Sequence, residues 1–256
     1  MRGVAALALA GVVALGAGCD NPSSTDDAEA SASATESAGN VTSPSGSVDT
    51  SDFATFPPER IAGAAKADMY RRLENVRYVG QITSGGRSIE LDLQAGTSGC
   101  QGTIGIGGGT AELRVLDGSN WIRADAAFWR ATLGDLADPA IAEIGEKWAL
   151  GGAQDLSLLC NIHEFFGATF MDARGSSTYR SIGTSTLDGQ EVAGIEQSGP
   201  DGTADIYVRV ESEHFVLKIV RTAGNEPGSV RFSDFDKEFH VDPPDPADVV
   251  DLSALG

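Results

Sequence analysis

Positive charge is scarce in this chain: 18 lysines and arginines stand against 37 aspartates and glutamates, which gives a formal net charge of -19. The phosphates of nucleic acids and anionic lipid head groups repel so acidic a protein. The scarcity excludes a general nucleic-acid-binding role. It also means that any membrane attachment has to come from an anchor rather than from a basic surface.

The chain also lacks an apolar run long enough to span a bilayer, which takes roughly 20 residues. Its longest apolar stretch is 3–18, which follows Arg2 and ends in Gly16-Ala17-Gly18, directly before Cys19. This pattern predicts a secretory signal. A Cys at that break predicts a lipoprotein signal, in which Cys19 is acylated with diacylglycerol and becomes the new N-terminus. Gly16 stands where such signals usually carry Leu, and a short transmembrane helix or an ordinary cleaved signal are the alternatives.

Residues 20–52 contain no Lys or Arg and consist almost entirely of small, polar and acidic residues. Such a composition cannot bury enough apolar surface to offset chain entropy, so it predicts a flexible tether. We therefore divide the chain into a lipoprotein signal peptide, 1–18, a disordered acidic tether, 19–55, and a single folded domain, 56–256. This order predicts a monomeric lipoprotein that is lipid-anchored in the cell membrane and faces outside the cytoplasm.

Cysteine is rare, and the three cysteines include no C-x-x-C pair of the kind that binds zinc. Cys100 and Cys160 form an even pair in an exported domain, where the compartment favours a disulfide. Two separate buried thiols are the alternative.

Catalytic signatures are missing as well. There is no G-x-S-x-G elbow, and no second His follows His163-Glu164 at zincin spacing. The acidic residues near the C-terminus lack the spacing of a calcium loop; they are Asp234, Asp236, Asp242, Asp245 and Asp248. We predict that the protein is not an enzyme and uses no cofactor and no metal.

Periodicity predicts the elements of the domain. Pro57 and Pro58 precede an amphipathic helix whose apolar stripe is Ile61, Ala65, Met69, Leu73 and Val76. Helices are expected within 125–170, including one over 155–166 that carries Cys160. Strands separated by turn signals are expected at 76–83, 87–93, 100–106, 110–116, 120–124, 179–187, 191–197, 204–210, 215–221 and 229–235. The pattern predicts an α+β fold: a strongly curved antiparallel sheet of about 10–11 strands, a half-open barrel covered by helices on its concave face.

Several runs between Ile61 and Leu255 resemble exported actinobacterial lipoproteins of the LppX/LprG type, which share the half-barrel of the lipoprotein carrier LolA. They are 80–86, 102–104, 107–113, 124–129, 146–148, 232–235 and 248–252. The resemblance implies a curved antiparallel sheet covered by helices, with a hydrophobic cavity for acyl chains.

Six aromatic residues are candidates to line such a cavity, or else to fill it as core. They are Trp121, Phe128, Trp129, Trp148, Phe165 and Phe166. The leading hypothesis is therefore an anchored lipoprotein that binds or carries a lipid or another apolar ligand. The alternatives are a cell-envelope interaction module with a filled core, and an enzyme of unknown type.

Overall fold

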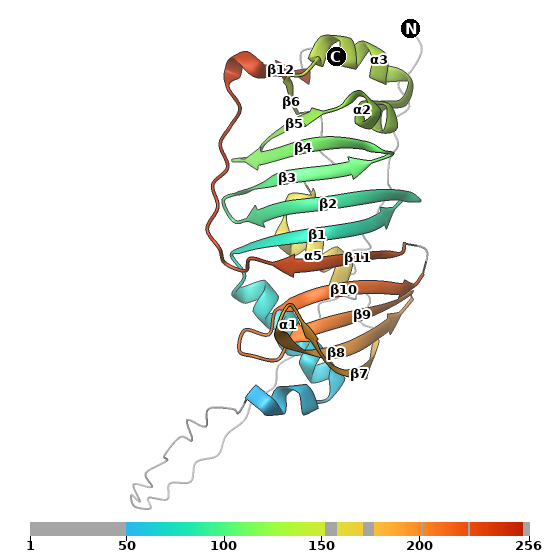
Figure 1. Cartoon of the computed structure of the whole chain (residues 1–256), viewed down its shortest axis with the longest axis vertical. Coiled ribbons are helices and arrows are strands. Elements are labelled where there is room, and N and C mark those ends of the chain that lie inside the picture. The colour runs from blue at the N-terminus through green and yellow to red at the C-terminus, as the bar shows by residue number, and fades with distance from the viewer. Residues whose placement is uncertain (1–49, 152–157, 171–176, 201, 225, 253–256) are drawn as a thin grey trace, which may run out of the picture. The chain divides into compact units, whose positions relative to one another are not determined.

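The computed structural model describes residues 50–151, 158–170, 177–200, 202–224 and 226–252 (Figure 1). These residues fall in one compact unit. Cys19 and the predicted tether up to residue 49 lie outside the described residues. The last six residues assigned to the tether form a short 3-10 helix, η1 (Thr50–Thr55), in which Phe53 is buried in the core.

The sheet contains twelve strands in the order β12-β6-β5-β4-β3-β2-β1-β11-β10-β9-β8-β7 (Figure 1). The first group comprises β1 (Asn75–Ser84), β2 (Arg87–Gly96), β3 (Gly99–Ile106), β4 (Gly109–Leu116), β5 (Ser119–Ala124) and β6 (Trp148–Leu150). The second comprises β7 (Thr178–Leu187), β8 (Gln190–Gly199), β9 (Gly202–Arg209), β10 (Val216–Ala223), β11 (Gly228–Ser233) and β12 (Val249–Asp251). The curved, mostly antiparallel and unclosed sheet confirms the predicted fold class, with twelve strands in place of 10–11.

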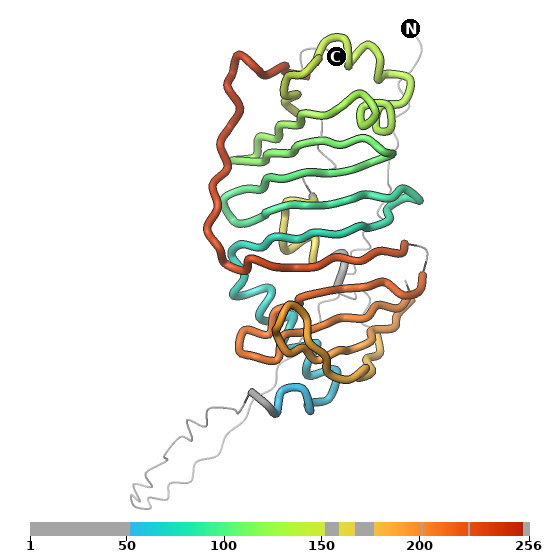
Figure 2. Tube along the Cα trace, viewed as in Figure 1, coloured from blue at the N-terminus to red at the C-terminus, as the bar shows by residue number. Residues whose placement is uncertain are grey.

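Tight turns set the register of the first group. Gly85-Gly86, Gly107-Gly108 and Asp117-Gly118 all have positive φ, as two-residue hairpin turns of the primed type require. The two groups meet through β1 and β11, which pair antiparallel with Tyr78 opposite Phe232. The segment after β11 then runs past the strand ends of the first group, and β12 pairs with β6 in parallel (Figure 2).

Two sequence expectations about elements are wrong. Trp148 was assigned to a helical stretch, but it begins β6, and 249–251 was assigned no element, but it forms β12. Each strand has only three residues, too few for an alternation of apolar and polar side chains to be recognised. Their pairing partners are also distant in the sequence. The helix expected at 155–166 is also different, because Cys160 ends the 3-10 helix η3 (Leu158–Cys160) and α5 (Ile162–Phe170) follows after Asn161.

The remaining helices are α1 (Pro58–Arg71), α2 (Ala126–Leu133), α3 (Ala137–Ile144) and the short 3-10 turns η2 (Gly134–Leu136) and η4 (Pro246–Asp248). In α1 the predicted stripe is buried at Ile61, Ala65 and Met69, but the helix ends before Val76, which lies in β1. Pro58 stands at the first helical turn, where its missing N–H is not needed.

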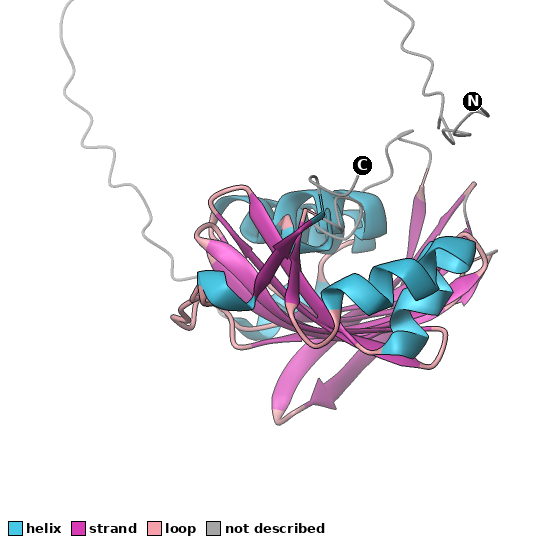
Figure 3. Cartoon of the chain, turned by 90° about the horizontal axis from the view of Figure 1, so that it is seen from above, coloured by secondary structure: helices cyan, strands magenta, loops and turns pink. Residues whose placement is uncertain are grey.

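Helices and sheet meet on one face of the sheet. Tyr78, Leu93, Gly102 and Leu113 lie opposite one another on successive strands, and side chains alternate between faces, so residues an even number of positions from these share their face. Gly109 belongs to this inner face, and a Cβ there would lie 1.9 Å from the Phe128 amide nitrogen, which places α2 on that face. Figure 3 shows the curve of the sheet with helices inside it.

Candidate functional site

The six aromatic residues singled out in the sequence divide between the two faces of the sheet. Trp121 pairs with Arg114 and Leu150, which are one position out of phase with the inner residues Leu113 and Ala149. Trp148 lies two residues before Leu150 on the same strand. The side chains of Trp121 and Trp148 therefore project from the outer face, away from the helices, whereas Phe128, Trp129, Phe165 and Phe166 lie on helices of the inner face.

Two arginines enclose Trp148 on the outer face. The guanidinium carbons of Arg114 and Arg123 lie 4.6 and 4.8 Å from the Trp148 ring centroid. Arg123 also donates to both carboxylate oxygens of Glu112 at 2.8 Å. Trp148 is buried by these outer-face contacts rather than by the inner core, so it is not in position to meet a ligand beneath the helices.

An aromatic cluster forms where α5 crosses the centre of the inner face. Phe165 stacks on Tyr78 of β1 with ring centroids 4.7 Å apart, and Phe166 lies 4.8 Å from Phe232 of β11. The four side chains are between 1% and 6% exposed. Sequence reasoning missed Tyr78 and Phe232, although each stands at an inward position of a predicted strand. The cluster fills the junction of the two strand groups with buried aromatic side chains.

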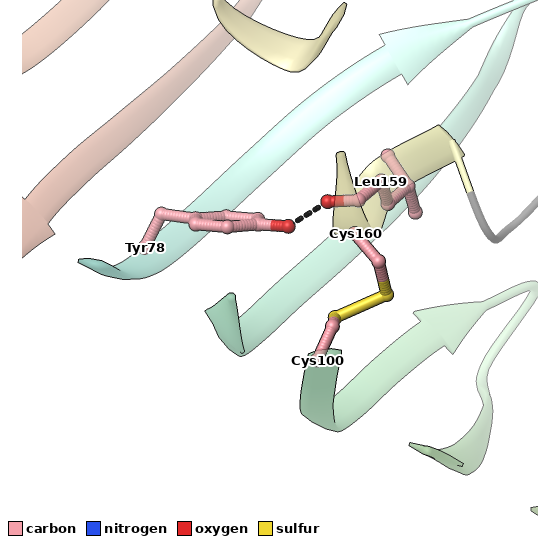
Figure 4. Close-up of a disulfide and its surroundings, with 4 residues drawn as sticks. All are labelled: Tyr78, Cys100, Leu159 and Cys160. Carbon is pink, nitrogen blue, oxygen red and sulfur yellow. Dashed lines mark hydrogen bonds between the residues drawn. A yellow bond between two sulfur atoms is a disulfide. The ribbon is translucent and has the colours of Figure 1, made fainter. Parts of the chain in front are cut away.

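Two links fix η3 beside this cluster. Cys100 on β3 is joined to Cys160 in η3 by a disulfide with Cα atoms 5.3 Å apart (Figure 4). The hydroxyl of Tyr78 donates a hydrogen bond to the Leu159 carbonyl. Burial raises the pKa of the Tyr78 phenol above its ordinary value, because the phenolate would lose its hydration. The segment between β6 and β7 is thus fastened to β1 and β3 at the point where it enters α5.

The side chain of Asp125 fixes the start of α2 on the sheet. Its carboxylate accepts hydrogen bonds from the amides of Phe128 at 2.8 Å and Thr110 at 2.9 Å. These two hydrogen bonds lower the pKa of Asp125, because they favour the charged carboxylate. Phe128 and Trp129 are buried in the core behind this N-cap.

Trp129 carries a polar atom with no partner. The side chain is 2% exposed, and its Nε1 has no hydrogen-bond acceptor among the described residues. Asn120 Oδ1 and His163 Nδ1 are likewise unpartnered there, but both residues are partly exposed.

A further aromatic contact fixes the N-terminal end of the described residues against the core. Phe53 of η1 stacks on His214 with ring centroids 3.6 Å apart and planes within 3°. The backbone amide of His214 donates to the Asp68 carboxylate of α1 at 2.8 Å. The position at which the chain enters the core is therefore fixed by Phe53, a residue that the sequence interpretation placed in the tether.

Two of the C-terminal aspartates considered for a calcium loop accept hydrogen bonds from the backbone. Asp236 accepts from the backbone amides of Glu74 and Asn75, and Asp245 caps η4 by accepting from the Ala247 amide. Among the described residues no group of His, Cys, Asp or Glu is arranged to hold a metal ion. No helix in the described ranges is both long and apolar enough to cross a membrane.

Solved structures match this chain, whereas no family model and no curated protein matches it. The structure of LprF from Mycobacterium bovis matches at 9% identity and a TM-score of 0.51, covering 73% of this chain and 96% of LprF. The Mycobacterium tuberculosis lipoprotein LppX matches at 12% identity and a TM-score of 0.48, covering 73% of this chain and all of LppX.

A LolA superfamily protein from Nitrosomonas europaea also matches, at 10% identity and a TM-score of 0.24, over 72% of this chain and 96% of that one. At 9% identity the match to LprF shows the fold alone. The chain has the fold of LprF, an unclosed curved sheet with helices on its inner face.

Proposed function

We propose that this protein is an exported lipoprotein, anchored to the cell membrane through acylated Cys19, that binds or carries a lipid or another apolar ligand. The ligand site lies between the inner face of the sheet and its helices. The observation that carries the proposal is the apolar aromatic cluster of Tyr78, Phe165, Phe166 and Phe232 between α5 and the sheet. The LprF-like fold and the lipoprotein signal predicted from the sequence support the same proposal.

Apolar burial would supply the binding free energy. Each CH₂ group transferred from water to such a site contributes about 0.8 kcal/mol, so an acyl chain needs no charged partner to bind. The inner face suits this chemistry, because no charged residue is buried in the described part of the chain, and the buried aromatic side chains of this face carry only the Tyr78 hydroxyl and the Trp129 indole N–H as polar groups. Of the six sequence candidates, the proposed lining keeps Phe128, Trp129, Phe165 and Phe166.

One observation favours a second candidate, a non-enzymatic interaction module of the cell envelope. Phe165 and Phe166 already fill the centre of the inner face and are only 6% and 3% exposed. A ligand there has to displace these rings or lie beside them, whereas an interaction module needs no cavity at all.

Extraction of the protein with organic solvent, followed by mass spectrometry, separates the two candidates. The protein should be purified under mild conditions from its native host. The carrier proposal expects stoichiometric co-purified lipid, whereas an empty and stable protein would favour the interaction module. Intact mass of the membrane-extracted protein tests the anchor separately, because an unmodified Cys19 would contradict it.

A further inference from the structure

Among the described residues that hold an unpartnered buried side-chain polar atom, Trp129 is the most deeply buried, and its unpartnered group is the indole N–H. Its side chain is 2% exposed and its Nε1 meets no acceptor there. Nine in ten or more buried polar groups in proteins have a partner, and an exception calls for an explanation such as a missing water or ligand. The Tyr78 hydroxyl on the same face follows the rule, because it donates to Leu159.

Trp129 lies on the face of the sheet that carries the proposed ligand site. Trp129 belongs to the same apolar core cluster as Phe165, Phe166 and Tyr78. It lies on α2, which covers β3 and β4 of the inner face, next to the region covered by η3 and α5. A ligand that extends from the aromatic cluster across β3 toward β4 would meet this ring.

Rigid contacts fix the position of the donor. The Asp125 carboxylate ties the first turn of α2 to the Thr110 amide of β4. The backbone of α2 also lies so close to Gly109 that no Cβ would fit between them. A donor held on a docked helix can select a ligand by geometry, because it does not have to be ordered when the ligand binds.

We propose that Trp129 is a specificity-determining residue whose indole N–H donates a hydrogen bond to a carbonyl oxygen of the bound apolar ligand. The proposal rests on the proposed function and adds the ligand's polar chemistry to it. Indole is a donor only, so it selects a ligand that carries an acceptor, such as an acyl ester, over a pure hydrocarbon of equal length. The hydrocarbon part would lie along the aromatic cluster of the inner face.

Indole N–H signals in a ¹H–¹⁵N spectrum test the contact directly, because the chain has only three tryptophans. The sample is the whole chain carrying Cys19→Ser, which keeps every described residue and removes the predicted acyl anchor. Trp129→Phe and Trp121→Phe variants assign the signals. Methyl palmitate and n-octadecane, each delivered from cyclodextrin, serve as the ester and hydrocarbon probes. We expect the Trp129 signal to move downfield with the ester and not with the alkane, while the outer-face Trp121 signal stays in place.

Affinities for the two probes complete the test. Trp129→Phe should bind methyl palmitate roughly fivefold more weakly, the factor given by one net hydrogen bond, and should bind n-octadecane unchanged. Trp121→Phe is the matched control and should alter neither affinity.

An ester preference that survives in Trp129→Phe, or a Trp129 signal that shifts equally with both probes, overturns the inference alone. If the Cys19→Ser chain with all three tryptophans binds neither probe, the proposed function is contradicted as well. Should Trp129→Phe not fold, the signal shift in the parent chain still decides.

Discussion

Asp125 is the residue on which the docking of α2 depends most directly. One carboxylate oxygen caps the Phe128 amide inside the helix, and the other accepts from the Thr110 amide on the neighbouring strand. The N-cap and the attachment of the helix to the sheet are thus made by one side chain. Replacing it separates the two effects, because asparagine can still cap a helix but has only one acceptor oxygen.

We expect Asp125→Ala to lower the free energy of unfolding by about 1–2 kcal/mol and Asp125→Asn to lower it by less. Denaturant unfolding measures both. Asp138→Asn is the matched control, because Asp138 belongs to an exposed ion pair with Arg130 and such pairs contribute about 0–1 kcal/mol. Equal stability of Asp125→Ala and the parent chain would contradict this role.

The lowered pKa of Asp125 predicts a dependence on acid. A carboxyl whose pKa falls on folding stabilises the folded state above its ordinary pKa of about 3.9. That contribution is lost as the pH falls through the lower folded value. The stability difference between the parent chain and Asp125→Asn should therefore be full near neutral pH and shrink below about pH 4.

At the scale of elements, η3 and α5 depend on covalent and polar links rather than on their own helix propensity. A three-residue 3-10 turn has almost no stability by itself. The disulfide to β3 and the Tyr78–Leu159 hydrogen bond hold it on the sheet. The inner-face aromatic cluster is consequently positioned by residues far apart in the sequence.

The double substitution Cys100→Ser and Cys160→Ser should lower the free energy of unfolding by up to roughly 4 kcal/mol. The disulfide closes a loop with a sequence separation of 60, and its removal returns that freedom to the unfolded chain. Denaturant midpoints of the oxidised parent and the double variant measure the change. Tyr78→Phe is the comparison, because it removes only the hydrogen bond, worth about 1 kcal/mol. A double variant as stable as the parent would show that the disulfide adds nothing to the attachment of η3.

At the scale of the whole molecule, the two outermost strands of the first group each pair with a strand from the C-terminal part of the chain. β1 pairs with β11, and β6 pairs with β12. The segment after β11 runs along the strand ends, where Arg114 donates to the Asp242 carbonyl, and it finishes as β12 on β6 (Figure 2). Val249 lies opposite Trp148 in this parallel pair. The last strand thus covers an edge of the sheet that would otherwise leave the backbone groups of β6 exposed.

Truncation after Asp248 removes β12 and should lower the melting temperature. A domain of this size loses roughly 2–4 °C for each kcal/mol of stability, so even a modest loss of edge pairing is measurable. Emission from Trp148 should shift to longer wavelength as its outer-face site opens. Truncation after Leu252 is the control, because it keeps every described strand. Equal melting temperatures for the two truncated chains would mean that β12 adds nothing to the fold.

Most strands and the fold class could be predicted from sequence, because the information they need is local. Alternating side chains define each hairpin strand, and Gly-Gly and Asp-Gly pairs define the turns between strands. The interpretation failed at β6 and β12, which are too short to alternate. It also failed to separate Trp121 and Trp148 from Phe165 and Phe166.

The sequence by itself determined the hairpins, the amphipathic α1 and the number of cysteines available for a bridge in the domain. Only the tertiary structure decided that β1 pairs with β11 and which face of the sheet each aromatic side chain occupies. It also decided that α2 buries an indole N–H without an acceptor among the described residues. The physical reason is that a shift of one residue in register exchanges the two faces of a strand, and register between distant strands is set by packing across the whole sheet.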